Sequence, residues 1–326
     1  MSKLIGRRTQ IAIGREEAAY GTKSSQIVDI PVQEISVDLT KDVLLNDQAY
    51  ARIEDNQIGS AIGKKTAEVT ISGITSGELI GQFLKAAFGT LVTGAATPVA
   101  GAETHTFTAE QTNDADSYSI IYKDGNDAKQ ILGAVLSRLE INIVVGEWVN
   151  YSATFIGIFP ADATETITPL TEELFTASHA VCKIATLVGG LAAASAVPLE
   201  TGTIVIEKNT EAHFTWGSHD VSKVHNKQLS ITADFELLYD DSSYFDDFDQ
   251  HTVMAMSITL TTDAFITGTT PFSLAITIPT YQISEFSNPR PLDELVRQSF
   301  SIKAEYDTVT SKMADAVLVN TAGNTY

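Results

Sequence analysis

Apolar and polar residues alternate along several short segments of the chain. Ile35, Val37 and Leu39 alternate with polar residues, and the same alternation recurs in residues 65–72 and 228–238. A period of two is that of a β-strand with one buried face, because successive side chains of a strand point to opposite sides. The pattern therefore predicts a protein that is mainly β.

Two segments carry the spacing of short amphipathic helices. Residues 75–89 begin with a capping-box sequence, Thr-Ser-Gly-Glu, continue with apolar residues on one helical face, and end at Gly89. Ser243 can cap a second helix that carries Tyr244, Phe245 and Phe248. We expect the first helix, which is amphipathic, to pack on a sheet.

The same order of elements occurs twice, in residues 35–158 and again in 203–306. Each copy has a strand, a polar segment, an alternating strand, a short helix, a variable loop and closing strands. When the copies are aligned, Leu136 falls on Ile283 and Leu139 on Phe286. The repeat predicts two tandem β-sandwich modules, each with a short flanking α-helix.

Composition shifts suggest where the modules begin and end. We predict an arm, a first module, a linker, a second module and a tail, at residues 1–34, 35–160, 161–202, 203–310 and 311–326. The tail is expected to be mobile, and the linker can hold one strand near 180–187. Residues 42–62 form a long polar segment, and loops of that length inside a compact domain tend to be functional.

The formal net charge of the chain is −20. It argues against a basic nucleic-acid-binding surface, because such affinity comes mostly from Lys and Arg at phosphates. The single cysteine, Cys182, cannot form an intrachain disulfide and is expected to be a buried small hydrophobe. The N-terminus has no apolar run like that of a signal peptide, and no stretch approaches the ~20 apolar residues of a membrane helix. We expect synthesis in a cytoplasm and no membrane contact.

Motifs for catalysis, cofactors or metals are weak. Residues 59–65 resemble a phosphate-binding loop, but three residues separate the glycines where four are needed. The six histidines lack the i, i+4 pairing of a zinc enzyme, and one cysteine cannot build a thiolate site. The acidic cluster in residues 234–249 lacks the spacing of a calcium loop. We expect no catalytic residue, no cofactor and no metal site.

Two interpretations of the acidic cluster stay open. It can be a solvated face, or it can line a channel whose carboxylates repel passing DNA. The aromatic residues Trp148, Trp216, Phe235 and Phe286 lie in largely apolar, strand-like segments. We expect these four residues in the core rather than on ligand-binding surfaces.

One segment resembles a known family. Residues 14–22, Gly-Arg-Glu-Glu-Ala-Ala-Tyr-Gly-Thr, are similar to the Gly-x-x-Glu-x-x-Tyr-Gly-Thr segment of major tail tube proteins of long, non-contractile-tailed bacteriophages. Glu17 and Tyr20 match that spacing. The layout of residues 35–88 and the acidic second half, with Phe-Thr-Trp-Gly-Ser at 214–218, resemble the family as well. The resemblance implies tail-tube-like β-sandwich modules whose inner sheets line a tube of stacked rings.

The resemblance further implies a structural virion protein of the phage tail, a passive conduit for DNA and not an enzyme. Three two-module chains would form a ring with pseudo-sixfold symmetry, with a hexameric ring as the alternative. Tape measure, tail tip and terminator proteins would be partners, and DNA would pass without specific binding. Expected ring-to-ring contacts are Arg7, Arg8, Asp42, Asp47, Arg52, Glu54, Asp55 and Lys64, and candidates for the lumen wall are Glu68, Asp234 and Glu236.

A non-catalytic β-sandwich that binds a host surface or carbohydrate is the alternative hypothesis. It would expose aromatic residues on loops, but residues 42–62 offer only Tyr50 and residues 89–103 offer none. A hydrolase on a β scaffold would need a His–carboxylate–nucleophile set, of which the sequence gives no sign. The tube subunit is therefore the favoured hypothesis.

Overall fold

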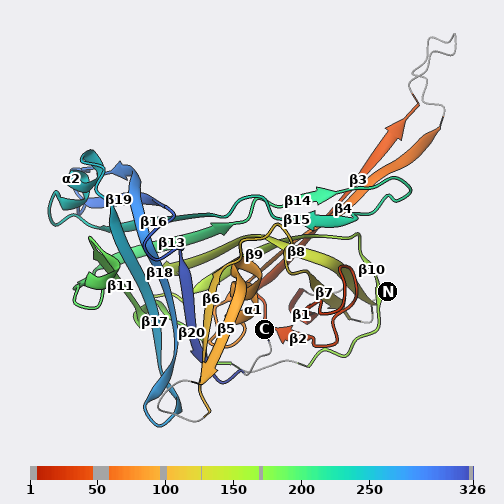
Figure 1. Ribbon diagram of the computed structural model, residues 1–326, viewed down its shortest axis with the longest axis horizontal. Coiled ribbons are helices and arrows are strands. Elements are labelled where there is room, and N and C mark those ends of the chain that lie inside the picture. The colour runs from red at the N-terminus through yellow and green to blue at the C-terminus, as the bar shows by residue number, and fades with distance from the viewer. Residues whose placement is uncertain (1–5, 47–58, 96–100, 126, 169–171, 323–325) are drawn as a thin grey trace.

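The computed structural model describes residues 6–46, 59–95, 101–125, 127–168, 172–322 and 326. Within these residues the chain is mainly β, as predicted, with two short α-helices (Figure 1). Nearly all of the strands are connected by antiparallel pairing into one network, and a separate small hairpin is formed by β14 (Glu211–His213) and β15 (Lys223–His225).

An eight-stranded antiparallel sheet, which we call the long sheet, runs through both halves of the chain. Its strand order is β3-β4-β9-β8-β13-β16-β19-β18. The strands are β3 (Glu34–Leu45), β4 (Ser60–Ile74), β9 (Asn150–Gly157), β8 (Asp127–Val144), β13 (Leu199–Glu207), β16 (Ser230–Leu238), β19 (Arg297–Ala304) and β18 (Thr270–Ser287). The halves join where β8 pairs with β13, with Ile141 opposite Ile204.

The remaining strands surround the first parts of β8 and β18. Beside β8 lie β7 (Tyr118–Asp124), β1 (Thr9–Arg15), β2 (Val28–Ile30) and β10 (Ala161–Ala163). Beside β18 lie β17 (Met254–Thr267), β11 (Ala180–Ala185), β12 (Ala196–Val197), β20 (Asp315–Asn320), β6 (Glu103–Ala109) and β5 (Gly89–Ala95). Side chains of both groups share one hydrophobic core with the apolar face of the long sheet, for example Ile13 of β1 and Leu318 of β20 with Phe155 and Phe300 of the long sheet.

Helix α1 (Ile80–Phe88) lies inside this core, and all of its residues are buried. The centroid of the Phe83 ring lies 4.7 Å from that of Tyr151 and 6.2 Å from that of Phe155 on β9. Gly89 follows the helix with a φ of 88°, a left-handed conformation that glycine adopts without strain. The predicted packing and C-terminus of this helix are therefore confirmed.

The start of α1 differs from the predicted capping box. The backbone N–H of Thr75 donates to the Val149 carbonyl and its C=O accepts from Phe175, and its buried Oγ1 has no hydrogen-bond partner among the described residues, so Thr75 does not cap the helix. The N–H of Leu79 is accepted instead by Ser76 Oγ at 3.3 Å and by a Glu172 carboxylate oxygen at 3.2 Å. The helix consequently begins one turn later than its sequence signature indicates.

Helix α2 (Ser243–Asp249) packs on the same apolar face in the second half. Tyr244 stacks on Phe300 with ring centroids 4.9 Å apart, and Phe248 stacks on Phe286 at 6.4 Å. Ser243 does not cap this helix as predicted, because its own N–H and hydroxyl donate to the Asp241 carboxylate.

Segments expected outside the modules take part in the sheets. The expected arm contributes β1, which pairs with both β2 and β7, and the expected linker contributes β11, which pairs along β17. The expected mobile tail contributes β20, which is hydrogen-bonded to β18 on one side and to β6 on the other. Its Leu318 and Asn320 are fully buried, and this burial holds the strand in place. The division into modules stays a prediction.

The polar segment 42–62 is more regular than predicted. β3 continues to Leu45 and β4 begins at Ser60, with Val43 opposite Ile62, and this pairing satisfies backbone groups that an irregular loop would leave to water. The two strands project from the body as a hairpin arm (Figure 1). Residues 47–58 fall outside the described residues.

Residues 14–22 fasten β1 to its neighbours through the buried side chain of Glu16. The Glu16 carboxylate accepts four hydrogen bonds, from the N–H groups of Gly21 and Gly133 at 2.7 and 2.8 Å and the hydroxyls of Ser117 and Ser119 at 2.6 and 3.1 Å. Tyr20 covers Gly133, whose φ is 60° and where a Cβ would stand 2.6 Å from the ring. Glu17, which matched the sequence pattern, is exposed.

Candidate functional site

The long sheet has an apolar face and a polar face. Residues directly opposite each other on neighbouring strands share a face. Asp234 lies opposite Thr203 on β13 and Ser301 on β19, and Glu68 lies opposite Asp38 on β3. The intervening residues of the same strands point into the core, so the alternation that predicted the strands also separates the two faces.

Carboxylates outnumber basic groups on the polar face of the described strands. The acidic members are Glu34, Asp38, Glu68, Glu140, Glu207, Asp234, Glu236 and Glu285, and the basic members are Arg138, Arg297 and Lys303. Arg138 is paired with Glu140 and Glu207, at 2.8 and 3.2 Å. Hydroxyl groups fill much of the rest, and the Oγ1 atoms of Thr70 and Thr154 lie 3.1 Å apart. The face is therefore acidic and hydroxyl-rich.

The structure brings all three lumen candidates, Glu68, Asp234 and Glu236, onto this one face. The sequence interpretation missed Glu34, Asp38, Glu140, Glu207 and Glu285, which lie on the same face. Each of the five occupies an outward position of an alternating strand, so the period of two was the signal that could have identified them.

Both ends of the long sheet have an edge with no strand on it among the described residues. At one end β3 pairs only with β4, and at the other the segment of β18 after Tyr281 pairs only with β19. Leu39 on β3 is 48% exposed, and Phe286 on β18 is partly exposed. Unpaired edges carrying apolar side chains are surfaces on which another strand can add.

The expected ring-to-ring contacts fall in three places. Asp42 and Lys64 lie on the hairpin arm and are exposed. Lys64 also contacts its own chain, with Nζ 5.0 Å from the centroid of the Phe214 ring. Arg7 and Arg8 lie in the 3-10 turn η1 (Gly6–Arg8), and Arg8 is exposed. The other four, Asp47, Arg52, Glu54 and Asp55, lie outside the described residues.

Exposed apolar side chains line the hairpin arm and its base. Val43, Leu44 and Leu45 are each more than half exposed. At the base, the backbone N–H of Lys65 donates to the His219 carbonyl at 2.8 Å, which holds residues 214–220 against the arm. This arrangement leaves an apolar projection that a second molecule can cover.

The expectation that four aromatic residues lie in the core is only partly correct. Phe235 is buried and Phe286 is half-buried, but Trp148 is 47% exposed and Trp216 is completely exposed. Trp216 lies in a turn, before Gly217 with a φ of 87°, and turns lie at the surface whatever their composition. A fully exposed tryptophan next to the hairpin arm adds to the exposed apolar surface of this region.

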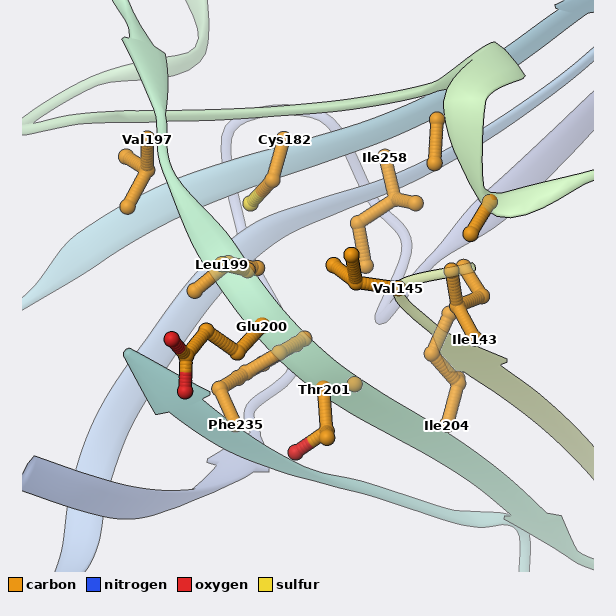
Figure 2. Close-up of a pocket in the computed structure, with 13 residues that line it drawn as sticks. Ile143, Val145, Cys182, Val197, Leu199, Glu200, Thr201, Ile204, Phe235 and Ile258 are labelled. Carbon is orange, nitrogen blue, oxygen red and sulfur yellow. The ribbon is translucent and has the colours of Figure 1, made fainter. Parts of the chain in front are cut away.

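A cavity of about 70 Å³ lies where the two halves of the long sheet meet (Figure 2). Val145, which follows β8, and Cys182, Val197 and Leu199 of the second half line it. Burial raises the pKa of the Cys182 thiol to about 12, so the thiol stays protonated at neutral pH. The mostly apolar lining identifies the cavity as part of the joint between the halves.

A buried lysine lies at the end of α1. Lys208 is 7% exposed, and its Nζ donates to the Ala86 carbonyl at 2.8 Å, close to the Lys85–Asp116 ion pair. Burial lowers the pKa of Lys208 from 10.5 to about 8, although the charges of Asp116 and Glu110 act in the opposite direction.

The buried amine makes a pH-dependent prediction. Between about pH 8 and pH 10.5 the unfolded chain holds a proton on Lys208 that the folded chain has lost, so stability gains a positive contribution as pH rises through this window. Relative to Lys208→Met, the wild type should gain about 2 kcal/mol between pH 7 and pH 10. Urea unfolding of both proteins at the two pH values measures this, and parallel pH dependences would contradict the prediction.

Comparison with known proteins identifies the family. In the part of the chain that the structure describes, no group of three or more His, Cys, Asp or Glu could hold a metal ion, and no helix is long and apolar enough to cross a membrane. A search of curated proteins gave no match. The family model described as phage tail tube protein matches residues 6–304, nearly the whole chain. The chain therefore belongs to the phage tail tube protein family.

Proposed function

We propose that this chain is a non-catalytic subunit that assembles into stacked rings to form the tail tube, a passive conduit for DNA. One observation carries the proposal. The long sheet is continuous through both halves, has one acidic, hydroxyl-rich face, and ends in edges on which no further strand lies within the described part of the chain. Edge pairing between copies would continue the sheet into a closed ring, which removes the exposed edges.

The polar face of the long sheet would line the lumen. α1 and α2 occupy the opposite face, and the core lies with them, so a ring closed through this sheet has only the polar face to turn inward. Glu68, Asp234 and Glu236 would then repel DNA phosphates, since tight DNA binding needs the basic groups that this face mostly lacks. DNA would pass without being held.

The hairpin arm would connect successive rings. Its exposed Leu44 and Leu45, with Trp216 beside its base, supply apolar area that water alone covers in a single chain. Arg7, Arg8, Asp42 and Lys64 would contribute charged contacts at the rim. Three chains per ring, with two modules each, is the arrangement that we propose, and the tape measure, tail tip and terminator proteins are the proposed partners at the ends of the tube.

A thiol-accessibility experiment tests both assembly and the lumen. In a Cys182→Ala background, Asp234→Cys places a thiol on the polar face, and Asp249→Cys places one on α2 as the matched control. Tubes should form in negative-stain micrographs, with threefold rings on averaging. A polyethylene-glycol maleimide of several kilodaltons should modify the control but not Asp234→Cys until the tubes are dissociated, whereas N-ethylmaleimide should modify both.

Two results would contradict the proposal. A protein that stays strictly monomeric at high concentration is not a self-assembling tube subunit. Tubes in which the bulky reagent modifies Asp234→Cys as fast as Asp249→Cys would place the polar face outside. Rings with six chains instead of three would replace the proposed symmetry and keep the conduit.

A further inference from the structure

The two halves of the chain repeat one pattern of strand pairing. On β8 and β9, Leu136 pairs with Phe155, and on β18 and β19 Ile283 pairs with Ile302. The distance along the sequence from Leu136 to Ile283 is the same as that from Phe155 to Ile302. Each pair of strands also has an irregularity at the corresponding place, directly after Leu136 and directly after Ile283. A β-bulge at the same position in both halves is a specific shared feature.

The repeat extends to strands that lie outside the expected modules. In the first half Ile11 of β1 pairs with Ile30 of β2, and β1 also pairs with β7. In the second half Cys182 of β11 pairs with Val197 of β12, and β11 also pairs with β17. β11 and β12 therefore correspond to β1 and β2, and each repeat begins within the segment expected to be an arm or a linker.

The correspondence continues into the next strand. Ile35 of β3 lies opposite Ile71 of β4, and Gly202 of β13 lies opposite Phe235 of β16. Ile35 lies five positions after Ile30, and Gly202 lies five positions after Val197. β13 thus takes in the second half the place that β3 takes in the first, as β18 takes the place of β8.

The contact between β8 and β13 inside the chain is consequently a template for a contact between chains. We propose that the edge of β18 and the residues after it pair antiparallel with β3 of a second copy, in the register of β8 on β13. Transferring that register places Phe286 opposite Leu39, Asn288 opposite Val37 and Arg290 opposite Ile35. The inference rests on the proposed assembly and specifies its interface residue by residue.

The two prolines after β18 are compatible only with this choice of which alternate residues form backbone hydrogen bonds to the second copy. In the template, Val145 N–H donates to the Glu200 carbonyl and Lys208 N–H to the Ser137 carbonyl, so alternate residues of the β8 segment bond β13. The corresponding residues in the second half are Phe286, Asn288, Arg290 and Leu292. Pro289 and Pro291 fall between them, where an N–H would point away from the second copy. A slip by one residue would put both prolines at bonding positions and turn Phe286 to the polar face.

A fully exposed leucine and a hollow complement each other across the proposed contact. Val145 lines the cavity at the joint together with Val197 and Leu199 (Figure 2). The counterpart of Val145 is Leu292, which is 100% exposed, and the counterpart of Leu199 is Val32. Val32 lines an open hollow of about 280 Å³ with Pro31, Gln33, Ile74 and Leu79. Leu292 of one copy would fill this hollow, and its N–H would donate to the Gln33 carbonyl.

Cysteine cross-linking tests the register. Asp38 and Ser287 lie at opposite ends of the long sheet, but the proposed register makes them a pair without backbone hydrogen bonds, whose close Cα atoms suit a disulfide. In a Cys182→Ala background, Asp38→Cys with Ser287→Cys should give, on mild oxidation, a covalent ladder that ends at the number of chains in the ring. Ser36→Cys with Ser287→Cys, displaced by two residues on the same face, should cross-link at least tenfold less.

The outcomes separate this inference from the proposed function. Rings that form normally but cross-link equally well, or better, through the displaced pair would overturn the register and leave the tube in place. A parent Cys182→Ala protein that never assembles would overturn both. As an independent check, Leu292→Ser should raise the concentration needed for ring formation at least tenfold while Val309→Ser, another exposed site, should not; equal effects would contradict a role for the hollow.

Discussion

Replacing Glu16 with alanine is expected to destabilise the fold by about 3 to 5 kcal/mol. The carboxylate is the shared acceptor for two backbone N–H groups, of Gly21 and Gly133, and for the hydroxyls of Ser117 and Ser119. The hydroxyls can rotate to other acceptors, but the Gly133 N–H would be left buried and the Gly21 N–H partly buried, both without a partner. Each unsatisfied buried donor costs about 1 to 3 kcal/mol, and a bond to a charged group contributes more than a neutral one.

Glu17→Ala is the matched control for this variant. It removes the same side chain one residue away, where Glu17 is exposed and accepts a single bond from Ser25 Oγ at 3.2 Å. Its effect should stay within about 0.5 kcal/mol of wild type. Urea unfolding followed by circular dichroism on dissociated protein measures both, and equal effects of the two variants would show that the carboxylate network does not hold β1 in place.

The same two residues show what a local motif can and cannot predict. The spacing in residues 14–22 singled out Glu17 and Tyr20, yet the buried carboxylate is that of Glu16. Which of two adjacent glutamates turns inward depends on Ser117, Ser119 and Gly133, which lie more than a hundred residues away in the sequence. A sequence pattern carries no information on such partners.

The alternation of apolar and polar residues predicted the strands well. Each strand buries one of its two faces and therefore shows this pattern in its own sequence, whatever its partners are. The matches of Leu136 with Ile283 and Leu139 with Phe286 agree with the observed pairing, since both members of each match face corresponding partners. The strand expected near residues 180–187 is present as β11, but the pairing partners of β1, β11 and β20 could not be predicted in this way. These short strands are held by pairing with distant segments rather than by a pattern of their own.

The sequence predicted the acidic character of the candidate site but identified only some of its residues. Glu68, Asp234 and Glu236 were identified because they stand at polar positions of alternating strands, and they do share a face. Trp216 was misplaced, because a large aromatic residue in an apolar segment is usually buried and only the fold shows that it lies in a turn. A residue that is buried only on assembly, which is the role proposed for Trp216, does not follow the burial rules of a single chain.

Phe155→Ala is expected to cost about 3 to 5 kcal/mol, through lost burial and the cavity left behind. Phe155 is fully buried on β9 between Val69 and Leu136, and its ring centroid lies 6.2 Å from that of Phe83 and 6.0 Å from that of Tyr118. These contacts join α1, β7 and the long sheet, so no single element can move to fill the space.

Phe155→Leu tests whether this loss is one of packing. Leucine restores most of the apolar volume but not the ring contacts, so it should recover more than half of the stability lost in Phe155→Ala. Thr154→Ala, on the polar face of the same strand, should change stability by less than about 1 kcal/mol, because the hydrogen bond that it removes is the one between the hydroxyls of Thr154 and Thr70. Denaturant unfolding of dissociated protein measures all three. A Phe155→Ala variant as stable as Thr154→Ala would contradict the packing of α1 on β9. It would also remove an argument for the proposed lumen, which assumes that the core and α1 occupy the apolar side of the long sheet.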